Sequence, residues 1–284
     1  MARRTILAMA MAIACGVSAT AAAPLWIERQ FIPDPDAVVD PVFAQWTPDS
    51  EILVDHAAWD DFLSTYVAAD KAGDHRVDYA GVTDEDRASL EAYIDRLEAI
   101  DPRTLNRDEQ LAFWINLYNA VTVRLILENY PVESIRKIDG PWAEERTRVI
   151  DVDLSLGDIE HKIVRVVYQD PRIHYALNCA AISCPNLAVV AYDGARLDDQ
   201  LTAAARAFVN SPKGVSFDDD GDLDVSKIFG WYKSDYGGSE QSAIDHIRLY
   251  ADDDLAARLD GVNGIDDYDY DWALNDQATI PPSN

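Results

Sequence analysis

Two cysteines and a histidine near the middle of the chain have the most reactive side chains in the sequence. Cys179 and Cys184 are five residues apart, and His174 precedes Cys179 by five residues. A thiolate is a nucleophile, and a nearby imidazole can lower the pKa of a thiol. Three interpretations stay open for the pair: a disulfide or two buried thiols, a nucleophile used with His174, or part of a metal site. Because a zinc site needs about four ligands and the CxxC spacing is absent, no metal and no cofactor is predicted.

Three asparagines could serve the same site. Asn116 and Asn119 are three residues apart in an apolar stretch, and Asn178 directly precedes Cys179. On a helix, residues three apart share a face, and a buried amide without a hydrogen bond costs about 1–3 kcal/mol. The amides could brace a neighbouring loop, or they could orient the imidazole and supply an oxyanion donor.

Further candidates come from two other segments and from the apolar stretch itself. His161 follows Glu160, and it could pair with an acidic neighbour at the surface or face the same site as His174. Trp114, Lys227 and Trp231 are candidate ligand contacts. We predict that one cleft collects the polar candidates, namely Asn116, Asn119, His161, His174, Asn178, Cys179 and Cys184.

A long helix over about 110–130 must position these residues. Its apolar side chains cover most of the circumference, which indicates a buried helix. Asn106 or Asp108 could cap its start, and Pro131 ends it. Twenty residues at about 1.5 Å per residue span roughly 30 Å, the width of a small domain.

The remaining pattern predicts a predominantly helical α+β single domain with a small sheet around the central helix. The alternation in residues 172–177 predicts a buried strand that carries His174. Further strands are expected at 149–152, near Val215 and Leu223, and at 265–272. Further helices are expected from Asp55, over 83–98, from Ser155, over 193–208, over 226–236 as a short helix plus loop, and over 242–250.

The amino-acid composition limits the classes of protein to which this chain can belong. The chain has 284 residues, of which 48 % are hydrophobic, and a net charge of −27. This acidity argues against a nucleic-acid partner and favours a solvated acidic surface. No apolar tract long enough to span a membrane follows the N-terminal segment.

The N-terminal segment has the pattern of an export signal. Arg3 and Arg4 precede an Ala- and Met-rich run and then small residues, so we predict a signal peptide over residues 1–23. Export by the Sec or the Tat route would place the protein in a periplasm or outside the cell. The expected organisation continues with an extended Pro- and Asp-rich lead-in over 24–50, one domain over 51–277 and a C-terminal tail over 278–284.

Seven motifs resemble a known family. They are AFWINLYNAV (112–121), YPVESI (130–135), SLGDIEH (155–161), DPRIHYALNCAAISCP (170–185), FVNSPKGV (208–215), SKIFGWYKSDY (226–236) and YDYDWALN (268–275). In this order they closely resemble domain-of-unknown-function family 547, over residues 55–275. The resemblance implies no established activity and no agreed catalytic residues.

Two functions are therefore expected from different classes. The first is a ligand- or protein-binding module with a polar cleft for a small molecule or an envelope peptide or protein. The second is a cysteine-dependent amide hydrolase or acyl transferase that uses Cys179 or Cys184 with His174. Its analogy to transglutaminase-like and papain-like folds is incomplete, because their nucleophilic cysteine heads the helix, where this chain has Phe113 and Trp114.

Overall fold

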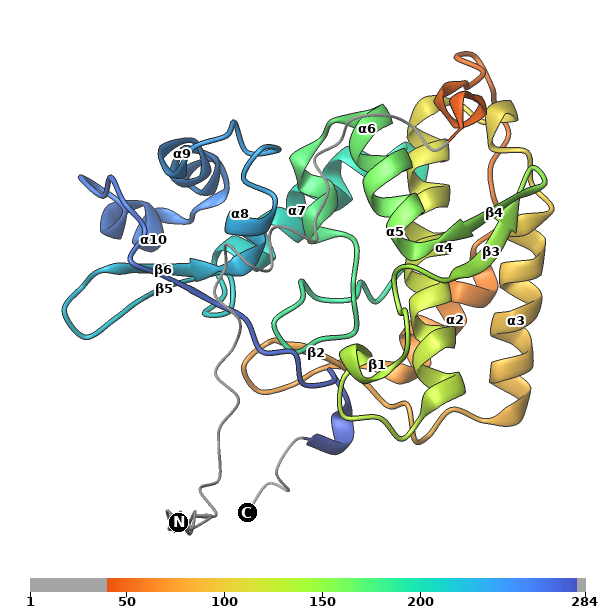
Figure 1. Ribbon diagram of the computed structural model, residues 1–284, viewed down its shortest axis with the longest axis horizontal. Coiled ribbons are helices and arrows are strands. Elements are labelled where there is room, and N and C mark those ends of the chain that lie inside the picture. The colour runs from red at the N-terminus through yellow and green to blue at the C-terminus, as the bar shows by residue number, and fades with distance from the viewer. Residues whose placement is uncertain (1–39, 280–284) are drawn as a thin grey trace, which may run out of the picture.

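The central helix α4 (Arg107–Asn129) organises the structure, a computed structural model that describes residues 40–279. The side chain of Asn106 caps the helix by accepting a hydrogen bond from the backbone N–H of Glu109. The helix ends before Tyr130, which Pro131 follows. Every residue from Glu109 to Val123 is buried, so the helix is enclosed on all sides, as its apolar pattern predicts (Figure 1).

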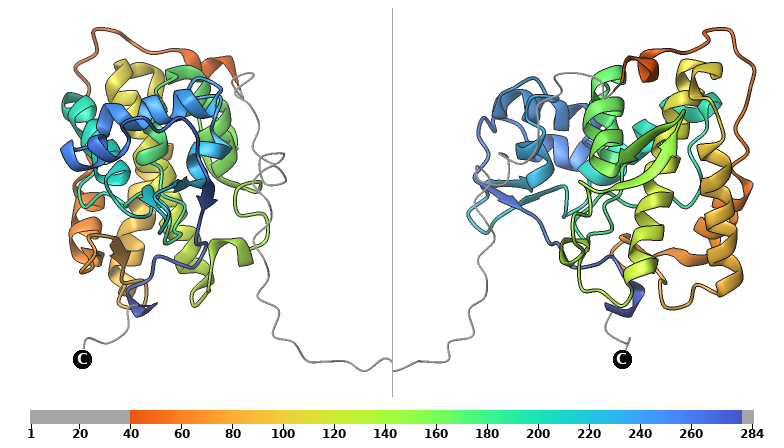
Figure 2. Two further views of the ribbon diagram at one scale, coloured as in Figure 1. Left: turned by 90° about the vertical axis from the view of Figure 1, so that its left-hand side faces the viewer. Right: turned by 45° about the vertical axis from the view of Figure 1, so that its right-hand side comes forward.

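Helices from earlier and later in the chain surround α4. α2 (Ala57–Tyr66) and α3 (Asp84–Glu98) lie on one side, and a π-helical turn (Glu160–Val164) joins α5 (Leu156–Ile159) to α6 (Arg165–Tyr168) on the other (Figure 2). The remaining α-helices are α7 (Leu197–Val209), α8 (Lys227–Trp231), α9 (Glu240–Tyr250) and α10 (Asp253–Arg258). Short 3₁₀ helices are η1 (Pro41–Ala44), η2 (Pro102–Thr104), η3 (Ile135–Lys137), η5 (Pro171–Tyr175), η6 (Gly194–Arg196) and η7 (Gln277–Thr279).

The strands form three small sheets within the described residues. β1 (Val67–Ala69) pairs with β2 (His75–Val77), and β3 (Glu145–Val149) pairs with β4 (Val152–Ser155), both antiparallel. β6 (Leu223–Ser226) lies between antiparallel β5 (Val215–Phe217) and parallel β7 (Asp267–Asp269). The predicted predominantly helical α+β class is confirmed, although the expected sheet is divided into three.

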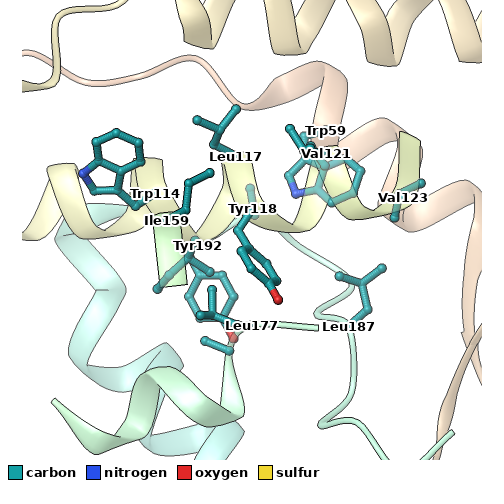
Figure 3. Close-up of a cluster of buried hydrophobic side chains, with 14 of the residues drawn as sticks. Trp59, Trp114, Leu117, Tyr118, Val121, Val123, Ile159, Leu177, Leu187 and Tyr192 are labelled. Carbon is teal, nitrogen blue, oxygen red and sulfur yellow. The ribbon is translucent and has the colours of Figure 1, made fainter. Parts of the chain in front are cut away.

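Two apolar clusters hold the fold together. The larger one surrounds α4 and includes Tyr118 of α4, Ile159 of α5 and Leu177, which follows η5 (Figure 3). The second lies among α7, α8, α9 and the three-stranded sheet, and it includes Phe208, Phe229 and Ile244. Within residues 40–279, no helix has the length and apolarity needed to cross a membrane.

The predicted strand over residues 172–177 is wrong. This segment forms the 3₁₀ helix η5. The carboxylate of Asp170 caps its start by accepting a hydrogen bond from the backbone N–H of Arg172. Pro171 at the first helical position favours the helical turn, because its ring fixes φ near −65°. The alternation of apolar and polar residues does not correspond to two faces, because every residue from Ile173 to Leu177 is buried.

The predicted strand over residues 149–152 is also displaced. Val149 ends β3 and Val152 begins β4, while Ile150 and Asp151 form the turn between them, both with positive φ. Two such central residues are typical of the tight turn of a β-hairpin.

The expected lead-in contributes to the core where the structure describes it. Phe43 of η1 is fully buried, and its ring packs edge-on against Trp114 with centroids 5.3 Å apart. The signal peptide expected over residues 1–23 lies outside the described residues, as does the end of the expected tail.

We expect Phe43→Ala to lower the free energy of unfolding by about 3–5 kcal/mol, because it removes a buried ring and leaves a cavity beside Trp114. Leu53→Ala is the matched control: Leu53 is nearby in sequence but 72 % exposed, so its truncation should change stability by less than about 0.5 kcal/mol. Chemical denaturation of both variants measures the difference. Equal effects would show that η1 is not part of the core.

Candidate functional site

A pocket of about 330 Å³ opens between the central helix, the α5–α6 segment and the C-terminal residues. Four aromatic rings form one side of it, which we call the aromatic wall: Trp142, Trp231, Tyr270 and Trp272. Tyr270 contacts both Trp231 and Trp272 with ring centroids 4.7 Å apart, and Trp142 contacts Trp272 at 5.7 Å. The other lining residues include Tyr118, Arg136, Glu160, His161, His174, Leu177, Cys179, Cys184 and Tyr232.

Glu160 is a buried carboxylate in the lining of this pocket. It lies at the start of the π-helical turn, a feature that is frequent at functional sites. The hydroxyls of Tyr118 (3.0 Å) and Tyr232 donate hydrogen bonds to its two oxygens. Burial alone would raise the pKa of Glu160, but His161, the Tyr232 hydroxyl and other neighbours outweigh it and lower that pKa. Glu160 is therefore charged near neutral pH.

A second carboxylate, the partly buried Asp235, joins two further side chains. Asp235 accepts hydrogen bonds from Arg165 Nε (2.7 Å) and Nη2 (2.8 Å) and from His174 Nε2 (2.8 Å). The Arg165 side chain is only 1 % exposed. Burial acts to raise the pKa of Asp235, but the hydrogen bonds from His174 and Arg165 prevail and hold it well below its usual value.

The hydrogen bonds settle which nitrogen of each imidazole carries the proton. Arginine can only donate, so the contact between Arg165 Nη1 and His161 Nδ1 (3.2 Å) makes that nitrogen the acceptor. Burial lowers the pKa of both His161 and His174, and both are neutral near pH 7. His161 therefore carries its proton on Nε2, and His174 carries its proton on the Nε2 that faces Asp235.

The two cysteines are free thiols in contact with each other in the same pocket. The backbone N–H of Cys179 donates to the sulfur of Cys184 at 2.9 Å, and the sulfur of Cys179 lies 3.1 Å from the Tyr270 hydroxyl. The interaction with Cys184, together with burial, raises the pKa of Cys179. Burial opposes ionisation of Cys184 as well, but the hydrogen bonds that its sulfur accepts lower its pKa. A negative charge on the pair resides mainly on Cys184.

Two of the predicted asparagines hold the segment that carries the cysteines, which we call the cysteine loop (residues 178–185). Asn119 donates to the carbonyl of Ala176 (2.9 Å) and accepts from the backbone N–H of Asn178 (2.8 Å). Asn178 then donates to the carbonyl of Pro185 (2.7 Å) and accepts from the N–H of Ala180. Both amides brace the backbone of the loop, and neither lines the pocket.

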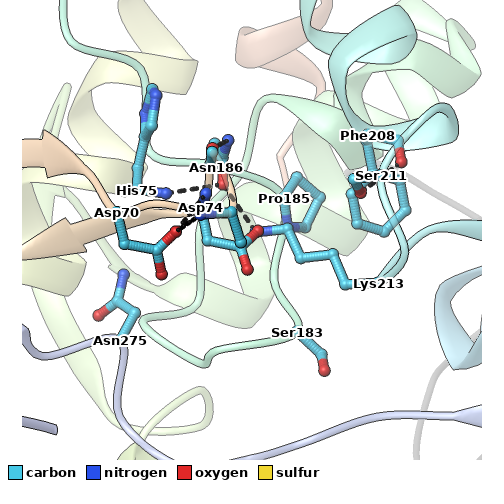
Figure 4. Close-up of polar contacts among 12 residues, drawn as sticks. Asp70, Asp74, His75, Ser183, Pro185, Asn186, Phe208, Ser211, Lys213 and Asn275 are labelled. Atoms are coloured by element: carbon cyan, nitrogen blue, oxygen red, sulfur yellow. Dashed lines mark hydrogen bonds and ion pairs between the residues drawn. The ribbon is translucent and has the colours of Figure 1, made fainter. Parts of the chain in front are cut away.

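The C-terminal side of the loop is anchored to the β1–β2 hairpin. Asn186 accepts hydrogen bonds from the backbone N–H of His75 (3.1 Å) and from the amino group of Lys213 (2.7 Å), and Lys213 also pairs with Asp74 (Figure 4). The cysteine loop is thus fixed at both ends by side chains from distant segments.

The predicted cleft gathers some of the candidates and not others. His161, His174, Cys179, Cys184 and Trp231 line the pocket. Asn116 instead bonds both the N–H and the carbonyl of Tyr192, and Trp114 lies in the core around α4. Lys227 is buried at the start of α8 and is not among the lining residues.

Several residues of the site were not among the site residues predicted from the sequence. Asp235 and Tyr232 lie in the aromatic-rich segment 226–236, and Glu160 adjoins His161. For these three residues, the candidate residues beside them in the sequence were the signal that could have indicated a place in the site. Arg165 follows His161 by one helical turn. Tyr118, Arg136, Trp142, Tyr270 and Trp272 carry no local signal, because only the folded chain brings them to the pocket.

The fold and the pocket define a helical α+β protein with a ligand-sized site of buried polar groups. The family model described as "Protein of unknown function, DUF547" matches residues 102–209. The match agrees with the resemblance of the motifs that lie within these residues, so this part of the chain is similar to the family. It covers α4, His161, His174 and the cysteine loop but ends before Tyr232, Asp235 and Tyr270. No curated protein and no solved structure matches the chain significantly.

We expect Asp235→Asn to lower the free energy of unfolding by about 3–5 kcal/mol at pH 7, because it leaves the buried charge of Arg165 without its closest carboxylate. The folded-state pKa of Asp235 is depressed, so its contribution is present above its ordinary pKa and is lost as pH falls through the folded value. The difference from the wild type should therefore shrink below about pH 4.

The matched control is Asp153→Asn, which removes the carboxylate from the half-exposed pair with Arg148. A surface pair contributes about 0–1 kcal/mol, so this variant should stay within that range at every pH. Urea unfolding from pH 7 to pH 3 measures both. A small effect of Asp235→Asn would contradict the assigned role of the buried pair.

Proposed function

We propose that this protein is an exported binding module whose pocket takes a small molecule or peptide end with an aromatic or apolar body and a carboxylate. The observation that carries the proposal is the aromatic wall, which presents four adjoining rings to a cavity of about 330 Å³. Ligand sites of this kind combine apolar walls with a few placed polar groups. The export signal expected over residues 1–23 suggests that the ligand is found in a periplasm or outside the cell.

Arg136 supports a negatively charged group on the ligand. Its guanidinium lies over the ring of Trp272 at 5.2 Å, and the residue is exposed at the edge of the pocket. Among residues 40–279 it has no carboxylate partner. Arginine binds carboxylates with paired hydrogen bonds, so a ligand carboxylate can take this place.

His161 supports a hydrogen-bond acceptor deeper in the ligand. Its Nδ1 is engaged by Arg165, so the proton resides on Nε2. No hydrogen bond to Nε2 exists within the described part of the chain, and His161 lines the pocket. This N–H is therefore free to donate to a carbonyl or hydroxyl oxygen of the ligand.

Binding can be tested with N-acetylated aromatic amino acids, which combine a ring, a carbonyl and a carboxylate, and with their uncharged amides. The intrinsic tryptophan fluorescence should change saturably, and Trp272→Phe should reduce the change. Arg136→Gln should weaken binding of the acids about fivefold, the loss of roughly 1 kcal/mol, and leave the amides unaffected.

Trp46→Phe is the matched control, because Trp46 also lies under an arginine, Arg107, at 5.5 Å but outside the pocket. This variant should bind the acids as the wild type does. An equal fluorescence change on binding in the Trp272→Phe and Trp46→Phe variants would place the ligand elsewhere.

A second candidate is cysteine-dependent acyl transfer, favoured by the Asp235–His174 pair. Asp235 holds the proton of His174 on Nε2, which leaves Nδ1 as the basic nitrogen, and both cysteines line the same pocket. A nucleophile, a base and an orienting carboxylate are the parts that such chemistry needs. No hydrogen bond joins His174 to either thiol within residues 40–279, so the substrate would have to complete the arrangement.

The second candidate predicts a burst of nitrophenol from 4-nitrophenyl acetate and an acetyl adduct on Cys179 or Cys184, located by mass spectrometry. His174→Gln should slow the burst at least about hundredfold, the usual minimum for loss of a general base. His75→Gln serves as the control, because His75 bonds the carbonyl of Leu187 outside the pocket. Absence of an adduct on both thiols would exclude this candidate.

A further inference from the structure

The two thiols in the pocket are arranged for a reaction with each other. Cys179 and Cys184 are in direct contact, and the N–H of Cys179 already points at the sulfur of Cys184 at 2.9 Å. Both sulfurs line the pocket, and Cys179 is the more exposed of the two. A disulfide partner that enters the pocket can therefore reach the pair.

The loop around the pair is held in place without a bond between the sulfurs. Asn178 closes it by bonding Ala180 and Pro185, and Asn119 fixes its start. The N–H groups of Ile182 and Ser183 donate to the carbonyls of Ala273 and Asp271, and Ala180 accepts from the N–H of Asn275. Because these contacts do not involve the sulfurs, the same framework suits a dithiol and a disulfide.

We propose that Cys179 and Cys184 form a reversible dithiol–disulfide site that exchanges electrons with a low-molecular-weight disulfide of the glutathione class. The proposal does not depend on what the pocket binds.

The exchange occurs in two displacements. In the singly ionised pair, with the charge on Cys184, the Cys179 sulfur attacks one sulfur of the small disulfide while its proton passes to the Cys184 thiolate, and the first small thiolate leaves. Cys184 then attacks the Cys179 sulfur of the mixed disulfide, and the second small thiolate leaves with the remaining proton. The two cysteines lose two electrons, which reduce the small disulfide to one small thiolate and one small thiol.

Tyr270 sets the balance between the two states. Its hydroxyl lies 3.1 Å from the Cys179 sulfur and also bonds the Cys184 sulfur, so it stabilises the reduced, partly ionised pair. A hydrogen bond to a thiolate favours the reduced form, because a disulfide sulfur is a much poorer acceptor. Removal of this hydroxyl shifts the equilibrium toward the disulfide.

The test equilibrates the full chain, with Cys15→Ser to remove the third cysteine, in buffers from fully reduced to fully oxidised glutathione. Free thiols are then trapped by acid and alkylation, and intact mass and peptide mapping count and locate the disulfide. We expect both the dithiol and the disulfide to be populated across the series. The disulfide should be a single bond between Cys179 and Cys184, and it should return fully to the dithiol when the buffer is made reducing again. In the same background, Cys184→Ser should accumulate the mixed disulfide with glutathione on Cys179.

Tyr270→Phe should raise the equilibrium constant for disulfide formation about three- to tenfold, the value of one hydrogen bond. Tyr268→Phe, two residues earlier and without a thiol contact, should leave it unchanged. Thiols that stay reduced in every buffer would overturn the proposal, and so would a disulfide that reduced glutathione never opens. An unchanged equilibrium in Tyr270→Phe would overturn the role of Tyr270.

Discussion

The burial of α4 on all sides forces each polar group on its surface to find a partner inside the protein. A buried amide left unpaired would cost about 1–3 kcal/mol, so Asn116 and Asn119 must bond the segments that pack against them. Asn119 does so with the backbone on either side of Leu177, and Asn116 with both backbone groups of Tyr192. These contacts fix where two irregular segments cross the helix. The position of the cysteine loop is therefore fixed by an amide side chain of α4, although α4 itself carries neither the cysteines nor His174.

The charged groups near the pocket form a balanced set that depends on mutual pairing. Glu160 is buried and Asp235 is partly buried, and both are ionised. Arg165, which pairs with Asp235, has almost no exposure. Desolvation alone would oppose each of these charges, and only their hydrogen bonds reverse that tendency. The two histidines are neutral in this environment, so each acts through the position of its single proton. The set is thus a source of oriented donors and acceptors more than a source of net charge.

The sequence predicted the elements whose pattern is local. The length and apolar circumference of α4 and its Asn106 cap could be predicted, because each depends on residues within a few positions. The prediction of a strand over 172–177 was wrong for the same reason, because it too relied on a local pattern alone. A short alternating run does not distinguish a strand from a turn, and the Asp170–Pro171 start decided in favour of η5. The site could be predicted from the sequence only where reactive residues are close together in the chain, as at His174, Cys179 and Cys184. Asp235 lies 61 residues beyond His174, and nothing periodic connects them.

The distribution of charge along the pocket constrains how a ligand can lie in it. Glu160 is buried and negatively charged, and its two oxygens already accept from Tyr118 and Tyr232. A ligand carboxylate placed beside it would suffer like-charge repulsion in a poorly solvated site, where such repulsion is weakly screened. Arg136 is exposed at the edge, so the negative group is stable there. For the proposed ligand, the inner end must then be neutral and accept from His161, while the apolar middle would lie against the aromatic wall. This orientation brings the middle of the ligand, and not its charged end, next to the paired thiols.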